Sequence, residues 1–152
     1  CTPKSPQCPL CPIRSFCASF GLDPESLPKK MTQGSKPTRQ STFLWIENER
    51  GEILLEKRPL KGLLGGLMGF PSQGLDAESS FLGAEHIHSQ RQIKQIVKHT
   101  FTHFHLIGTV VKGVCAREKF SGTWVMPQDL PLYALPRLMQ KVKDVVLHEE
   151  PR

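Results

Sequence analysis

The sequence has few aromatic residues, few acidic residues and a single cysteine outside its first 17 positions. Only 7% of its 152 residues are aromatic, and 14 acidic residues stand against 20 lysines and arginines. No apolar run is long enough to span a bilayer, and no segment has the layout of a signal peptide. These absences exclude a membrane protein and predict a soluble, cytoplasmic chain. The net charge of +6 favours a polyanionic partner.

The cysteines that are present gather at one end of the chain. A disulfide-stapled secreted domain would spread its cysteines through the fold, whereas a cluster without a secretion signal predicts metal in a reducing compartment. The chain also begins on a cysteine rather than on methionine, so we expect it to be part of a longer protein. The clustered residues are Cys1, Cys8, Cys11 and Cys17, and Cys115 stands apart as a predicted buried thiol.

The four clustered cysteines follow the spacing C-x6-C-x2-C-x5-C. A 4Fe-4S cluster needs one thiolate on each iron, which four converging cysteines would supply. Structural zinc also takes four cysteines, usually as two C-x2-C pairs, and here only Cys8 and Cys11 have that separation. The spacing therefore favours iron–sulfur over zinc or incidental thiols. We expect the cluster to be lost easily from a chain that starts at its first ligand.

Composition divides the chain into three segments. Residues 1–20 form the predicted cysteine loop, and prolines at regular intervals in it oppose a helix. Residues 21–40 mix proline, glycine, serine and basic residues, which is typical of an exposed linker. Residues 41–152 are long enough for one core and predict an α+β domain, a mixed sheet flanked by helices.

Hydrophobic patterning places the elements of that domain. Two strands at 43–46 and 52–58 are predicted to form a hairpin around a turn that contains Gly51. Pro136 is placed to open a final helix with one apolar face. The other predicted elements are a short strand at 67–70, one or two short helices at 76–86 and 89–96, a long strand at 99–111, and a partner strand at 114–119 after a turn at 112–113.

Two motifs resemble one known family. The cysteine spacing is similar to that of endonuclease III and the adenine DNA glycosylases. Residues 58–71 read R-P-x-x-G-L-L-G-G-L-x-x-F-P, which resembles the C-terminal domain of MutY-type adenine DNA glycosylases, a domain with a Nudix-like fold. The family usually has a Trp-Glu pair where this chain has Met68 and Gly69. The resemblance covers nearly the whole chain.

The resemblance implies residues that recognise damaged DNA. In the family an F-S-H segment contacts the oxidised guanine opposite the target adenine, and Phe101, Thr102 and His103 occupy that place here. The alternative is that Thr102 only satisfies strand propensity and Phe101 belongs to the core. The family's loop between the first two cysteines meets the DNA backbone, so Lys4 is a candidate phosphate contact, with a solvated charge as the alternative.

The resemblance also implies what this chain lacks. The family hydrolyses the bond between adenine and deoxyribose with acidic residues of an N-terminal domain, which would precede Cys1. We therefore expect no catalytic residue in this chain and an inactive fragment of a base excision repair enzyme. Its expected partners are that missing catalytic domain and double-stranded DNA with 8-oxoguanine opposite adenine, and we expect it to be monomeric.

Two other function classes stay open. A Nudix nucleotide pyrophosphatase needs several carboxylates on one helix to hold Mg²⁺. The segment after Gly74 offers Asp76, Glu78 and Glu85, without the arrangement R-E-x-x-E-E-x-G. A protein-interaction module that binds through its basic linker is the other alternative. His99, His103 and His105 would share one face of the predicted long strand, but no fourth metal ligand accompanies them.

Overall fold

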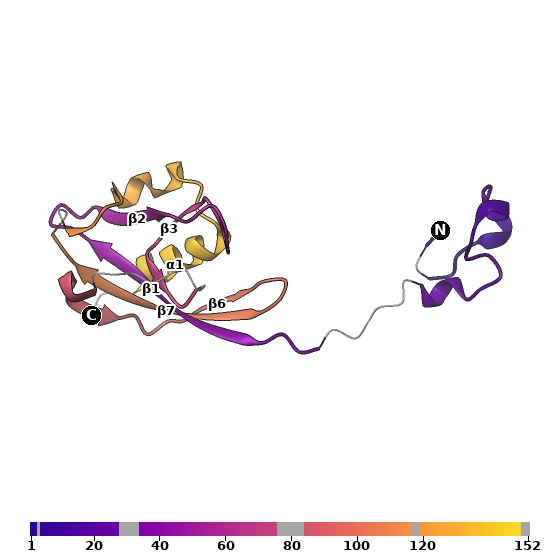
Figure 1. The fold of residues 1–152 in the computed structure, drawn as a ribbon, viewed down its shortest axis with the longest axis horizontal. Helices are drawn as coiled ribbons and strands as arrows, with labels where there is room; N and C mark the ends of the chain where they lie inside the picture. Colours follow the sequence, from indigo (N-terminus) through magenta and orange to yellow (C-terminus); the bar gives the residue numbers. More distant parts are fainter. Residues whose placement is uncertain (3, 28–33, 76–83, 117–118, 150–152) are drawn as a thin grey trace. The chain divides into compact units, whose positions relative to one another are not determined.

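The computed structural model describes residues 1–2, 4–27, 34–75, 84–116 and 119–149. Its contacts divide the chain into two compact units, Cys1–Ser35 and Lys36–Arg152 (Figure 1). None of the described helices is long and apolar enough to cross a membrane.

The first unit consists of short turns of 3₁₀-helix. Proline lacks the N–H that an α-helix needs, and Pro9 and Pro24 stand at the starts of two of these turns. None of the turns buries a residue, and large side chains such as Leu10 and Phe16 remain exposed. The unit therefore has no core of its own among its described residues. The turns are Cys8–Leu10, Arg14–Phe16 and Pro24–Ser26.

The second unit is built on a mixed sheet. In chain order its described strands are β1 (Thr38–Glu47), β2 (Ile53–Lys57), β3 (Met68–Gly69), β4 (Ser72–Gln73), β5 (His88–Gln92), β6 (Val97–Thr100), β7 (His105–Val114) and β8 (Thr123–Val125). The helix α1 (Arg137–Leu147) follows, and 3₁₀ turns lie at Ala84–His86 and Pro127–Leu132.

The central strand β1 sets the topology. It runs parallel to β7 over its whole length, and it pairs antiparallel with β2 and β4. Strands β5 and β6 pair with successive parts of β7, and β8 and β3 pair with successive parts of β2. The predicted mixed sheet with a flanking helix is present.

Alternating residues of β1 and β2 supply two hydrophobic clusters. Phe43 and Trp45 belong to the larger cluster, whereas Leu44 and Ile46 belong to the smaller one. Because successive side chains of a strand point to opposite faces, both faces of the sheet are covered here. That explains why residues 43–46 are a continuous apolar run rather than an alternating one.

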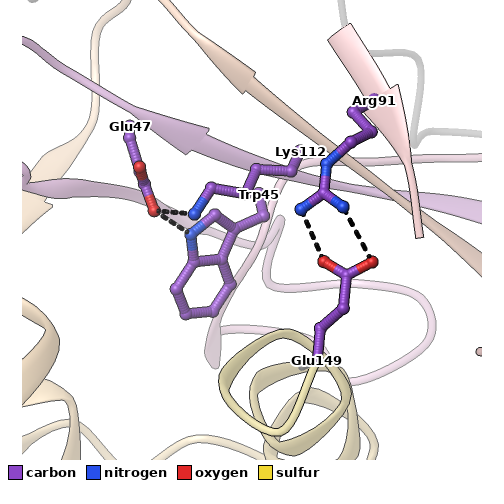
Figure 2. A network of polar contacts seen from close by, with 5 residues as sticks. All are labelled: Trp45, Glu47, Arg91, Lys112 and Glu149. Atoms are coloured by element: carbon purple, nitrogen blue, oxygen red, sulfur yellow. Dashed lines mark hydrogen bonds and ion pairs between the residues drawn. The ribbon is translucent and has the colours of Figure 1, made fainter. Parts of the chain in front are cut away.

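The helix α1 covers the larger cluster. Leu138, Met139, Val142, Val145 and Val146 are all buried, as the apolar periodicity predicts. Pro136 precedes the first helical residue and serves as the N-cap. Just after the helix, Glu149 forms a bidentate ion pair with Arg91 of β5, at 2.6 and 3.0 Å, which ties the chain's end to the sheet (Figure 2).

A second polar contact lies between the central strands. Glu47 accepts a hydrogen bond from the Trp45 indole and forms an ion pair with Lys112, both at 2.8 Å (Figure 2).

The predicted hairpin is present as β1 and β2, and the predicted short strand near residues 67–70 is present as β3. Asn48 Oδ1 accepts from the N–H groups of Arg50 and Glu52 in the hairpin turn, and Gly51 has φ +75°.

Four element predictions are wrong. The expected long strand at 99–111 is two strands, β6 and β7, which fold back on each other as a hairpin. Strand β7 continues through the expected turn at 112–113, because its parallel pairing with β1 extends to Val114. The partner strand expected at 114–119 is therefore wrong as well, since Cys115 and Ala116 lie in no strand. Residues 88–92 form β5 instead of a helix, and most of the other expected helix, residues 76–83, lies outside the described residues.

Candidate functional site

A four-residue turn joins β6 to β7 and presents two of the predicted site residues to solvent. Thr100 pairs with His105, and the Phe101 N–H donates to the Phe104 carbonyl at 2.9 Å. Thr102 and His103 at the tip are exposed. The three predicted recognition residues therefore lie together, on a turn rather than on a strand.

An aromatic group supports this turn. The Phe101 ring lies 4.7 Å from both the Phe104 ring and the His99 ring, centroid to centroid. Phe104 is buried and Phe101 is half-buried, so both phenylalanines point inward while the tip points outward. Phe101 thus belongs partly to the core, as the alternative interpretation held, while Thr102 does not lie in a strand.

The beginning of β1 holds the turn from one side. The Pro37 carbonyl accepts from the His105 N–H at 2.9 Å, which starts the parallel pairing of β1 with β7. Lys36 Nζ donates to the Phe101 carbonyl at 3.2 Å, and the Arg39 guanidinium lies 4.4 Å from the centre of the Phe104 ring. The sequence assigned these basic residues to a linker, but β1 begins at Thr38.

More cations surround the base of the turn. Lys141 Nζ donates to the Lys98 carbonyl at 2.7 Å, which brings α1 against β6. Asp144 shares a shallow hollow with Lys98 and Lys141, and it is paired with Lys143 at 3.6 Å. Within the described residues, no carboxylate forms an ion pair with any of the five cations around the turn, Lys36, Arg39, Lys98, Arg137 and Lys141.

His99 experiences this positive surrounding directly. Burial lowers the pKa of His99 below its ordinary value, and the charges of Lys141 and Arg137 lower it further. Its Nδ1 atom is buried and finds no hydrogen-bond partner in the part of the chain that the structure describes. The lowered pKa favours the neutral ring, which packs against Phe101. The predicted shared face of His99, His103 and His105 does not exist, because the turn separates them.

The four clustered cysteines line one cavity in the first unit. Its volume is about 430 Å³, and its other walls include Leu10, Ile13 and Phe20. All four thiols are free. Four thiols around one partly apolar cavity are a donor set that suits an iron–sulfur cluster. In the described ranges, no three His, Cys, Asp or Glu side chains lie close enough together to hold a metal ion.

Lys4 is exposed in this unit, and its carbonyl accepts from the Thr2 hydroxyl at 2.6 Å.

Of the carboxylates considered for Nudix chemistry, Asp76 and Glu78 lie outside the described residues. Glu85 is exposed and lies 3.7 Å from His86. Glu56 on β2 has a pKa raised by burial, which the charge of Arg58 opposes.

Sequence reasoning missed the five cations around the turn. They come from the start of β1, from β6 and from α1, and no local pattern in the sequence connects these segments. The parallel pairing of β1 with β7 brings Lys36 and Arg39 to the turn, more than sixty residues from Phe101. The excess of positive charge was the one available signal, and it does not show where in the fold the cations lie.

Two family models match the chain. The model of the NUDIX domain matches residues 42–144, and the iron-sulfur binding domain of endonuclease III matches residues 1–17. An adenine DNA glycosylase from Arabidopsis thaliana is 37% identical over 94 residues. That similarity covers 52% of this chain and 15% of the relative, so the chain spans a small part of that relative's length.

Solved structures share the fold of the second unit. A MutT protein from Methanosarcina mazei matches with a TM-score of 0.56 at 20% identity, covering 78% of this chain and all of that one. The C-terminal domain of mouse MUTYH, solved in complex with human PCNA, matches with a TM-score of 0.53 at 22% identity over 72% of this chain and 87% of that one. The chain thus belongs to the NUDIX domain family, and a sequence that matches the iron-sulfur binding domain of endonuclease III precedes its NUDIX domain.

Proposed function

We propose that this chain is the lesion-recognising part of an adenine DNA glycosylase that removes adenine paired with 8-oxoguanine in base excision repair. The observation that carries the proposal is the β6–β7 turn, which exposes Thr102 and His103 among cations without carboxylate partners in the described chain. Apart from Lys36, which donates to the Phe101 carbonyl, such cations favour DNA phosphates, which would position the turn without reading sequence. Hydrolysis itself would need acidic residues of a catalytic domain outside this chain.

The tip of the turn carries the chemistry that distinguishes the lesion. Normal guanine presents N7 as an acceptor in the major groove. In 8-oxoguanine that position becomes an N–H donor beside a new carbonyl acceptor. The Thr102 hydroxyl can accept from the new N–H, and the Thr102 backbone N–H can donate to the new carbonyl. That backbone N–H has no partner among the described residues, so it is available.

The other predicted residues have supporting roles in this proposal. Phe101 sets the position of the tip through its aromatic contacts, and exposed His103 faces the DNA. Lys4 contacts a phosphate from the first unit. The full protein would act as a monomer, with the base flipped from the duplex into its catalytic domain.

Cys1, Cys8, Cys11 and Cys17 would ligate a 4Fe-4S cluster in the full protein. Their spacing, the family match over residues 1–17 and their common cavity support this assignment. The cluster would cross-link a unit that has no core among its described residues. A reducing cytoplasm would keep the thiols available.

The experiment that tests the recognition proposal replaces Thr102. Thr102→Ala in the full-length protein removes the hydroxyl, and we expect a loss of about 1–2 kcal/mol, roughly tenfold, in affinity for duplex with 8-oxoguanine opposite adenine. Binding to undamaged duplex should barely change. Thr102→Ser retains the hydroxyl and should bind both duplexes like the original protein. Fluorescence anisotropy with both duplexes measures the ratio of the affinity for 8-oxoguanine duplex to the affinity for undamaged duplex.

Equal losses of affinity for both duplexes would make Thr102 structural and move the recognition site elsewhere. The similarity to the MutT fold favours one rival, a Nudix hydrolase of oxidised nucleotides. Incubation with Mg²⁺ and 8-oxo-dGTP discriminates between the two functions, and we expect no release of pyrophosphate or phosphate above background. Turnover that Glu78→Gln or Glu85→Gln abolishes would favour the rival.

A further inference from the structure

The contact between Lys36 and Phe101 reaches a peptide group that matters for the proposed recognition. The Phe101 carbonyl, which accepts from Lys36 Nζ at 3.2 Å, belongs to the same planar peptide as the Thr102 N–H. In a trans peptide the C=O and N–H bonds point in opposite directions. A carbonyl directed at Lys36 therefore directs the Thr102 N–H away from Lys36.

Within the described residues, Lys36 is the one hydrogen-bond donor to this carbonyl. The tight turn is closed by the bond from the Phe101 N–H to the Phe104 carbonyl, and no backbone N–H donates back to the Phe101 carbonyl. Without Lys36 the peptide between Phe101 and Thr102 would have no other partner in this part of the chain to fix its rotation.

Lys36 is itself held in place next to the turn. Its neighbour Pro37 accepts from the His105 N–H at 2.9 Å, and Thr38 pairs with His105 in the parallel register. Arg39, one residue further, covers the Phe104 ring. The backbone that carries Lys36 is thereby fixed to the C-terminal end of the turn, and the ammonium needs little reorganisation to reach the carbonyl.

We propose that Lys36 is a positioning residue for lesion recognition, which aims the Thr102 N–H outward and strengthens it as a donor to the carbonyl of 8-oxoguanine. A charged donor on the carbonyl polarises the peptide, and polarised hydrogen-bond chains strengthen their next bond. This inference rests on the proposed function of the turn. Lys36 acts through Thr102 and touches no DNA base in this role.

Lys36→Met in the full chain tests the role, because methionine keeps most of the side chain and removes the ammonium. We expect the ratio of affinities for 8-oxoguanine duplex over undamaged duplex to fall roughly threefold to tenfold, the size of one weakened hydrogen bond. Lys36→Arg retains N–H donors and should recover most of the ratio. Lys94→Met is the matched control, since Lys94 is exposed and makes no hydrogen bond or ion pair in the described chain.

A second measurement reports on the peptide itself. The amide ¹H and ¹⁵N shifts of Thr102 in the DNA-free chain should change in Lys36→Met and stay unchanged in Lys94→Met. A role limited to overall stability would leave these shifts unchanged and would lower the unfolding midpoint together with both affinities.

The outcomes separate this inference from the function it rests on. If Thr102→Ala changes the affinity ratio while Lys36→Met changes it no more than Lys94→Met, the role of Lys36 is overturned and the recognition turn stands. If Thr102→Ala leaves the ratio unchanged, the recognition proposal fails first. If Lys36→Met weakens binding to both duplexes equally, Lys36 is a phosphate contact instead, which also overturns the positioning role.

Discussion

Burial lowers the pKa of His99, and the positive charges of Lys141 and Arg137 lower it further. Its pKa is lower in the folded chain than in the unfolded one, so the unfolded chain binds more protons as the pH falls through the ordinary histidine range. The folded state therefore has its full stability above that range and loses stability as the pH falls toward the lowered pKa.

We expect His99→Asn to reduce this pH dependence. The free energy of unfolding should fall less for the variant than for the original chain between about pH 8 and about pH 5. Urea unfolding at a series of pH values measures the difference. His103→Asn is the control, because His103 is exposed on the turn that follows β6. Identical pH profiles for His99→Asn and the original chain would contradict the account of His99.

At the scale of elements, the contact between β1 and β7 depends on one glycine. A Cβ on Gly108 would lie 2.6 Å from Cε2 and 3.0 Å from Cδ2 of Phe43, which is fully buried. Strand β7 can therefore pass beside Phe43 only without a side chain at this position. Strand β7 follows the turn at residues 101–104, so this packing also fixes where that turn ends.

Gly108→Ala should destabilise the second unit by about 1–3 kcal/mol through overpacking. Denaturant unfolding measures the loss, and Gly34→Ala is the control because a Cβ there meets nothing within 4 Å. A second substitution, Phe43→Leu, should be less costly in the Gly108→Ala background than alone, since it removes the clashing ring atoms. A fully stable Gly108→Ala chain would show that the two strands are not packed in this way.

The whole molecule divides its cysteines between two different environments. Four thiols of the first unit share a cavity, whereas Cys115 of the second unit is buried with a pKa raised by that burial. A buried, protonated thiol is a poor metal ligand, because metal binding requires the thiolate. Substitution of the clustered cysteines should therefore affect metal binding, whereas substitution of Cys115 should not.

Full-length protein prepared without oxygen should be brown and contain about four irons per chain. Cys8→Ala or Cys11→Ala should lower the iron content and the visible absorbance, while Cys115→Ala should leave both unchanged. Metal analysis by mass spectrometry measures the content. One zinc per chain and no iron would instead support the zinc alternative.

Local sequence patterns determined several parts of this protein. The run at 43–46, the turn at Gly51 and the apolar stripe after Pro136 specify strands, hairpin and helix from neighbouring residues alone. The cysteine spacing and residues 58–71 indicated the family, because several fixed separations must agree at once. Composition could also indicate the excess of positive charge.

Only the tertiary structure decided where the turn between β6 and β7 lies and what holds it. Residues 97–114 are rich in threonine, phenylalanine and valine, which favour strands, and a local pattern cannot show that the chain reverses at residues 101–104. The reversal places both Phe101 and Phe104 in an aromatic group with His99, while the parallel pairing of β1 with β7 brings Lys36 to the Phe101 carbonyl. Such contacts depend on which distant segments pair, because packing energy is gained only when the whole sheet has formed.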